Sequence, residues 1–251
     1  MKKAAKAVIH GALRSVGLDL IRYDRTAETY PPDFGEDEVE IIRAVRPWTM
    51  TSLERLFALI QAVRHVSRHS IPGAIVECGV WKGGSMAAVA RTLLKLNDAS
   101  RDLYLFDTFT GMPEPSDKDV EYSGKHATQV LSEEVGSQCA DAPLESVQQV
   151  LFETGYPKDK LHFVPGRVEE TIPTSSPESI SLLRLDTDWY ESTRHELVHL
   201  FPRVVKGGGI IVDDYGHWRG SRRACDEYFA EHGISILLHR IDYTGRIGIK
   251  P

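Results

Sequence analysis

The sequence predicts an α/β fold: a doubly wound, mostly parallel sheet of seven strands, with an antiparallel C-terminal strand and additional N-terminal helices. Two observations predict it. Short apolar segments typical of buried strands alternate with helical patterns from residue 74 to residue 232. The last two apolar segments are instead joined by a short turn. The 251 residues, of which 41% are hydrophobic and 26% charged, are enough for one domain with a buried core.

Residues 1–35 are predicted to form an N-terminal extension, and residues 36–251 the folded domain. The segment 1–25 is basic, and its apolar residues recur near helical spacing. It therefore has two interpretations: a helix that packs on the domain or on a second copy in a homo-oligomer, or a helix that lies on a membrane surface. Arg14 and Asp19 interrupt the apolar core that a signal peptide needs, so no signal peptide is expected.

The elements of the domain follow from hydrophobic periodicity and from the glycines and prolines that interrupt it. Two helices, at 37–45 and 52–69, precede the sheet. Strands are expected at 74–77, 103–107, 161–164, 180–186 and 210–213, and helices at 83–96, 144–154, 168–172, 192–201 and 221–232. The segments 234–241 and 246–249 are expected to form a terminal hairpin. The polar stretch 114–143 is expected to be a lid over the site, without a packed element.

The composition excludes several classes of protein. A formal net charge of -6 argues against a nucleic-acid partner, which needs a basic surface. Cys78, Cys139 and Cys225 are odd in number and far apart, so neither a disulfide framework nor a zinc site is indicated, and a reducing cytoplasm fits. No segment has the roughly 18 to 20 consecutive apolar residues of a transmembrane helix. Small-molecule chemistry is the remaining expectation.

A glycine loop follows the first predicted strand, where an open parallel sheet binds its ligands. Gly79 allows a tight turn, and Ser85 lies at the start of the next helix, where backbone N–H groups are free. Trp81 stands where a dinucleotide fingerprint needs glycine, which disfavours NAD and a nicotinamide oxidoreductase. Glu77 would repel a pyrophosphate but suits the ammonium group of S-adenosylmethionine. A glycine turn that binds no ligand is the alternative.

The next two strand ends supply further candidate cofactor contacts. Asp107 follows the second strand, where its two oxygens can accept hydrogen bonds from a ribose diol. Gly166 lies in a Pro-Gly turn after the third strand, where backbone groups can lie beside an adenine and Val168 can pack on it. The alternative for this third end is a turn with no ligand.

Acidic residues follow the fourth and fifth strands. Asp186, Asp213 and Asp214 are predicted to meet at one sheet edge, where they would repel one another unless a cation intervened. A set of carboxylate oxygens favours Mg²⁺ or Mn²⁺ over Zn²⁺. Asp188 is a reserve ligand, provided the strand continues far enough to put it on the same face as Asp186. The alternative role for each of these acids is to cap the following helix.

A bound metal would orient a hydroxyl and lower its pKa, but a base must still take the proton. His126, in the predicted lid, is the candidate base, because it could close over the site and its reference pKa is near 6.5. His217 is a second candidate. A ligand aspartate, Asp186 among them, could also serve, so Asp186 is counted among the catalytic residues.

Six motifs together resemble the macrocin O-methyltransferase family, which has a Rossmann-like class I methyltransferase fold. The motifs are TMT (49–51), VECGVWKGGS (76–85), DTFTGMP (107–113), VPG (164–166), LDTDWY (185–190) and GGGIIVDDY (207–215). The resemblance covers about residues 40–251. It implies metal-dependent methylation of sugar hydroxyls in natural products and glycans, and it implies that Thr49 and Met50 join Glu77, Gly79, Ser85 and Asp107 in binding S-adenosylmethionine. It also implies the metal set of Asp186, Asp213 and Asp214, and a histidine in the mobile loop.

The expected function is therefore S-adenosylmethionine-dependent and metal-dependent O-methylation of a sugar hydroxyl on a small molecule or glycan. One alternative keeps the fold and takes a catechol or another phenol as the acceptor. The mostly polar lid, with Tyr122 as its one aromatic residue, favours the sugar. A second alternative is a non-catalytic binding module on the same scaffold, which the acidic triad disfavours.

Overall fold

The computed structural model describes residues 30–133 and 142–251, and all elements named below belong to the compact unit Phe34–Pro251. The helical pattern predicted at residues 1–25 lies outside the described residues. Within the described ranges, no helix is both long and apolar enough to cross a membrane.

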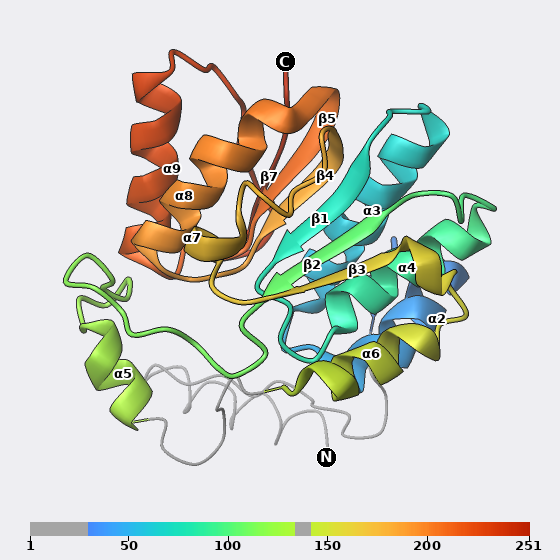
Figure 1. Ribbon diagram of the computed structural model, residues 1–251, viewed down its shortest axis with the longest axis horizontal. Coiled ribbons are helices and arrows are strands. Elements are labelled where there is room, and N and C mark those ends of the chain that lie inside the picture. Colours follow the sequence, from blue (N-terminus) through green and yellow to red (C-terminus); the bar gives the residue numbers. More distant parts are fainter. Residues whose placement is uncertain (1–29, 134–141) are drawn as a thin grey trace, which may run out of the picture. The chain divides into compact units, whose positions relative to one another are not determined.

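A seven-stranded sheet forms the centre of this unit (Figure 1), in the order β3-β2-β1-β4-β5-β7-β6. The first five strands in this order are parallel, and β7 and β6 are antiparallel to their neighbours. The predicted doubly wound sheet with an antiparallel end is confirmed. The strands are β1 (Ala74–Cys78), β2 (Leu103–Asp107), β3 (Leu161–Pro165), β4 (Ile180–Leu185), β5 (Val204–Val212), β6 (His239–Arg240) and β7 (Arg246–Ile249).

Helices cover both faces of the sheet (Figure 1). The helices α2, α3, α4 and α6 lie on one face, and α7, α8 and α9 lie on the other. Their bounds are α2 (Glu36–Val45), α3 (Leu53–Arg68), α4 (Gly84–Lys95), α6 (Leu144–Phe152), α7 (Val168–Thr171), α8 (Tyr190–Leu200) and α9 (Arg219–Glu231), with short 3₁₀ turns η1 (Arg46–Trp48), η2 (Lys158–Lys160) and η3 (Phe201–Arg203).

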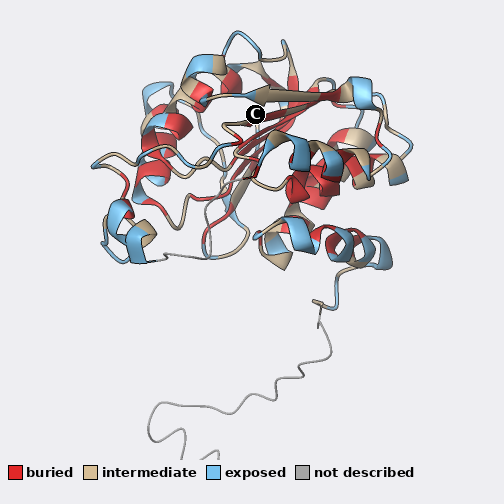
Figure 2. Ribbon diagram, turned by 60° about the horizontal axis from the view of Figure 1, so that its bottom comes forward, coloured by how far each residue is buried: buried red, intermediate tan, exposed pale blue. Residues whose placement is uncertain are grey.

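Alternation along the strands assigns each side chain to one helical layer. Val76 on β1 and Leu183 on β4 pack with Leu197 of α8 and Tyr228 of α9 in one buried cluster. Ile75 and Leu182, the alternate residues on these strands, are also buried but lie outside this cluster, as expected for the opposite face of the sheet. Figure 2 shows that the strands and inner helix faces are buried, whereas outer helix faces are exposed. The buried sheet thus leaves only the strand ends accessible to a ligand.

Two predicted strands differ from the observed ones by more than one residue. β5 begins at Val204, six residues before the predicted start, because its glycines are part of the strand. A Cβ atom on Gly208 would lie 2.9 Å from the backbone oxygen of Ser181, so the glycines allow close packing on β4. The segment predicted as a strand over 234–241 forms only the two-residue, exposed β6.

The predicted lid contains a packed element, so the expectation of an unpacked stretch over 114–143 was wrong in this part. Helix α5 (Ala127–Glu133) buries Ala127 completely, and Val130 and Leu131 pack against Trp189 and Trp218. Three apolar residues at helical spacing were too weak a periodic signal within a polar stretch. Residues 134–141 are outside the described part of the chain.

Candidate active site

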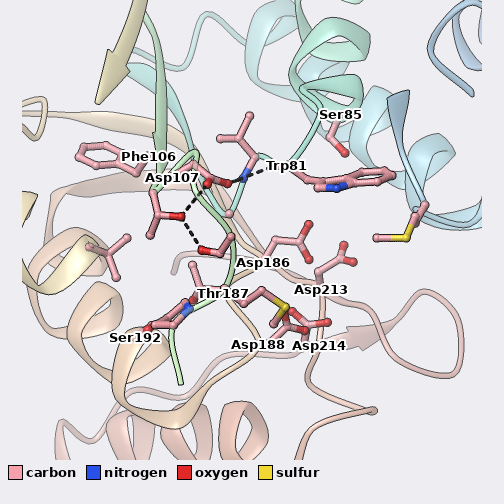
Figure 3. Close-up of a pocket in the computed structure, with 18 of the residues that line it drawn as sticks. Trp81, Ser85, Phe106, Asp107, Asp186, Thr187, Asp188, Ser192, Asp213 and Asp214 are labelled. Carbon is pink, nitrogen blue, oxygen red and sulfur yellow. Dashed lines mark hydrogen bonds between the residues drawn. The ribbon is translucent and has the colours of Figure 1, made fainter. Parts of the chain in front are cut away.

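A cavity of about 240 Å³ opens at the carboxyl ends of the parallel strands (Figure 3). Most residues predicted for the site line this cavity, although they come from distant parts of the sequence. These residues are Thr49, Met50, Gly79, Ser85, Asp107, Gly166, Asp186, Asp213 and Asp214. Glu77 and His126 are not among the lining residues. The topology therefore brings together the strand-end residues that the sequence separates.

Asp107 fixes the glycine loop between β1 and α4. Its Oδ2 accepts hydrogen bonds from the backbone N–H groups of Val80 at 2.6 Å and Trp81 at 3.0 Å. Its Oδ1 accepts from the N–H of Phe109 at 2.7 Å. One carboxylate thus holds the loops that follow β1 and β2, and it still lines the cavity.

Gly79 allows the chains after β1 and β4 to come into close contact. Its φ of +84° lies in the left-handed region, and a Cβ atom there would lie 2.0 Å from the carbonyl oxygen of Asp186. Any side chain would push these two loops apart.

Replacing Gly79 with alanine is expected to lower the free energy of unfolding by about 3 kcal/mol or more, because a backbone clash adds to the strain of a positive φ. Gly155→Ala is the matched control, since Gly155 also has a positive φ of 81° but has no atom within 4 Å of the added Cβ. Its expected cost is only about 1 kcal/mol. Urea unfolding monitored by circular dichroism measures both values, and equal losses would contradict the close-contact argument.

Glu77 lies beneath the cavity and is paired with a buried arginine. It stands opposite Arg184 in the register of β1 and β4, and Arg184 Nη1 donates a hydrogen bond to its Oε1. Its Oε2 is buried and has no hydrogen-bond partner among the described residues. Burial raises the pKa of Glu77 to about 7, although the positive charge of Arg184 opposes this shift. The free oxygen is an unused acceptor in β1, just before the glycine loop.

The structure brings Asp186, Asp213 and Asp214 together, and one carboxylate oxygen of each lies within 4.8 Å of the others (Figure 3). Arg184 donates to Asp186 Oδ2 and Asp213 Oδ1, both at 2.7 Å, and Arg55 donates to Asp213. Asp214 Oδ2 is buried without a partner among the described residues. Burial and then the neighbouring carboxylates keep the pKa of Asp214 well above its usual range. The two arginines therefore do not neutralise the whole cluster, and an all-oxygen set with a free acceptor fits a divalent cation.

Asp188 also lines the cavity, but it lies beyond the end of its strand. β4 ends at Leu185, and Asp188 has a left-handed φ of 66°. Its Oδ1 accepts a hydrogen bond from Trp218 Nε1 at 2.8 Å. Burial, followed by the charge of Asp186, raises the pKa of Asp188 to about 7. Asp188 thus lies outside the set of three, but its carboxyl group is within hydrogen-bond reach of that of Asp214.

The two candidate histidines lie outside the cavity lining. His126 Nε2 donates to the carbonyl oxygen of Ser116 at 3.1 Å, and its Nδ1 accepts from the hydroxyl of Thr128 at 2.7 Å. Both ring nitrogens are therefore used within the loop. His217 lies 3.3 Å from the Tyr243 hydroxyl through its Nδ1. The role predicted for His126 stays a prediction.

Two arginines of the site were missed by the sequence analysis. Arg184 is 3% exposed, and a charged residue within the apolar strand pattern Leu-Leu-Arg-Leu is a signal that could have identified it. Arg55 reaches the site from the first turn of α3, where its helical position gives no indication of a role.

The chain is similar to proteins of known activity. The family model described as "Macrocin-O-methyltransferase (TylF)" matches residues 15–247. The 8-demethyl-8-(2,3-dimethoxy-alpha-L-rhamnosyl)-tetracenomycin-C 4'-O-methyltransferase of Streptomyces olivaceus is 33% identical over 253 residues, covering 98% of this chain and 93% of that protein. The mycinamicin III 3''-O-methyltransferase of Micromonospora griseorubida is 35% identical over 200 residues, covering 78% of this chain and 76% of that protein. The solved structure of the O-methyltransferase NovP shares 31% identity and superposes with a TM-score of 0.71, covering 81% of this chain and 82% of that one.

Proposed function

The chain belongs to the macrocin O-methyltransferase family and is an S-adenosylmethionine-dependent O-methyltransferase, and on this premise we propose that it methylates a sugar hydroxyl of a glycoside with the help of a divalent metal. The cluster of Asp186, Asp213 and Asp214 at the cavity carries the proposal. The relatives support a sugar as the acceptor, because the Streptomyces olivaceus protein is named as a methyltransferase of a rhamnosyl-tetracenomycin.

The cavity residues divide into two groups that fit the two bound species. Asp107, Ser85 and the glycine loop line the cavity and would hold S-adenosylmethionine, whereas Glu77 lies outside the lining, so its contact with the ammonium group stays a prediction. Asp186, Asp213 and Asp214 would hold Mg²⁺ or Mn²⁺. The cofactor supplies an electrophilic methyl group, and the metal supplies a positive charge that lowers the pKa of a hydroxyl.

The protein's own residues then orient the acceptor and remove its proton. Transfer would join the acceptor oxygen to the methyl carbon supplied by bound S-adenosylmethionine and would leave S-adenosylhomocysteine, with the electron pair of the broken carbon–sulfur bond on sulfur. We assign the hydroxyl proton to Asp188, because Asp188 lines the cavity beside the three aspartates whereas both ring nitrogens of His126 are used in the loop. Arg184 holds Asp186 and Asp213 in place during the transfer.

A screen with methyl-labelled S-adenosylmethionine and Mg²⁺ tests the proposed acceptor. The panel contains glycosides with free sugar hydroxyls and, as the competing class, catechols and other phenols. Labelled glycoside, with the methyl group located on the sugar by mass spectrometry, is the expected result. If only phenols are labelled, the acceptor is a phenol and not a sugar. If the protein binds S-adenosylhomocysteine but labels no compound, a binding module is favoured.

Replacing Asp107 with alanine is expected to weaken the affinity for S-adenosylhomocysteine about 10- to 100-fold, since three backbone N–H groups lose a charged acceptor and the glycine loop loses its anchor. Isothermal titration calorimetry measures this affinity. Asp102→Ala is the control, because Asp102 precedes β2 and so lies at the opposite end of the same strand. Equal affinities of the two variants would show that Asp107 does not contribute to cofactor binding.

A further inference from the structure

Trp218, immediately before α9, contacts both the carboxylate of Asp188 and the helix α5. It is 6% exposed, and its Nε1 donates the 2.8 Å hydrogen bond to Asp188 Oδ1. Its backbone N–H donates to the carbonyl oxygen of Asp214 at 3.0 Å. Trp218 therefore contacts one acid of the site through its side chain and another through its backbone.

The ring of Trp218 also supports α5. It packs edge-on against Trp189, with ring centroids 5.0 Å apart at an angle of 69°, and the fully buried Ala127 completes this cluster. Val130 and Leu131 pack on it from the same helix. The same indole thus packs against α5 and donates the hydrogen bond to Asp188.

Backbone hydrogen bonds attach the chain before α5 to the residues on either side of Trp218. The N–H of Tyr122 donates to the carbonyl oxygen of His217 at 2.8 Å, and the N–H of Arg219 donates to that of Val120 at 2.8 Å. The segment from Val120 to Glu133 therefore contacts the chain around Trp218 twice: through backbone hydrogen bonds of Val120 and Tyr122, and through the side chains of α5.

We propose that Trp218 is a positioning residue that fixes the Asp188 carboxylate at the cavity wall and couples its orientation to the seating of α5. This inference rests on the proposed function, because it takes the cavity as the site of methyl transfer. The left-handed backbone of Asp188 leaves its side chain without the alignment that a continuing strand would give. A directional N–H bond supplies that alignment, and it persists only while the indole is held in its packed position.

The first test measures the hydrogen bond and the coupling without any acceptor substrate. In ¹H–¹⁵N spectra of the full chain with S-adenosylhomocysteine and Mg²⁺, Trp218→Phe identifies the Trp218 indole signal by its loss. Exchange of this indole proton with solvent should accelerate roughly 10-fold or more in Asp188→Ala, which removes the acceptor, and also in Val130→Asp, which unseats α5. Ser132→Asp is the matched control, since it adds the same charge to the exposed side of α5.

The second test separates positioning from stability. Trp218→Phe is compared with Tyr156→Phe, because Tyr156 is also buried, lies outside the cluster around α5, and donates from its hydroxyl to the carbonyl oxygen of Arg101 at 2.8 Å, so each variant loses one side-chain hydrogen bond of a buried aromatic residue. With a glycoside that the acceptor screen identifies as a substrate, Trp218→Phe should lower kcat roughly 10-fold or more with little change in KM, and Tyr156→Phe should lower it much less.

Three results would overturn the inference: unchanged exchange of the Trp218 indole proton in Asp188→Ala, unchanged exchange in Val130→Asp, or equal losses of kcat in Trp218→Phe and Tyr156→Phe. Failure of the proposed function has a different signature, namely wild-type protein that does not bind S-adenosylhomocysteine in calorimetry. The exchange measurements do not need that binding, so they decide in either case whether Trp218 couples Asp188 to α5.

Discussion

Asp214→Ala is expected to lower the rate of methyl transfer by roughly 10³-fold, equivalent to about 4 kcal/mol of transition-state stabilisation. The reason is geometric, since Asp214 supplies one of three carboxylate oxygens that lie within 4.8 Å of one another. Without it, two acids that are already paired with Arg184 remain. Initial rates with labelled cofactor, over a range of Mg²⁺ concentrations, measure the effect.

The controls distinguish loss of a metal ligand from loss of the cofactor site. The affinity of Asp214→Ala for S-adenosylhomocysteine should stay close to that of the wild type, because Asp214 contacts none of the groups that anchor the glycine loop. Asp159→Ala removes an exposed acid in η2, before β3 and at the other end of the strands, and should leave the rate unchanged. EDTA should abolish wild-type transfer, and Mg²⁺ should restore it. Full activity in EDTA would contradict the metal role.

The sheet and the cavity lining were predictable because both depend on periodicity and on strand ends. Asp107 ends the apolar strand β2, Asp186 and Asp213 directly follow β4 and β5, and parallel strands place their carboxyl ends at one edge. The same rule located Gly79 and Gly166 at the cavity. Local sequence therefore specified where these residues would meet.

The interactions beneath the cavity could not be predicted in this way. Glu77 meets Arg184 because β1 and β4 are neighbours, and the strand order depends on packing across the whole chain. Asp188 depends on a positive φ and on an indole 30 residues away. Neither feature leaves a periodic signal, so the sequence offered Asp188 only as a reserve ligand, on the condition that its strand continued, and offered a loop histidine as the candidate base.

Asp188→Asn is expected to lower kcat about 10²- to 10⁴-fold, the range typical for loss of a general base. Asparagine keeps the size of the side chain and an oxygen that can accept from Trp218, so the loss would come from the missing proton acceptor. His126→Ala is the competing variant, and a fall of roughly 10²-fold or more is expected there if His126 is the base instead. Rates are measured at saturating cofactor, acceptor and Mg²⁺.

The pair of variants decides between the two bases because each has a distinct structural consequence. His126 receives or donates hydrogen bonds only within the loop before and at the start of α5, so its loss can disturb α5 but leaves the cavity wall intact. Asp188 is part of that wall. A large loss of kcat in Asp188→Asn with a near-normal rate in His126→Ala assigns the proton to Asp188. The reverse pattern would require the loop to rearrange so that His126 reaches the acceptor, and it would then be the seating of α5, not the Trp218 hydrogen bond, that controls proton removal.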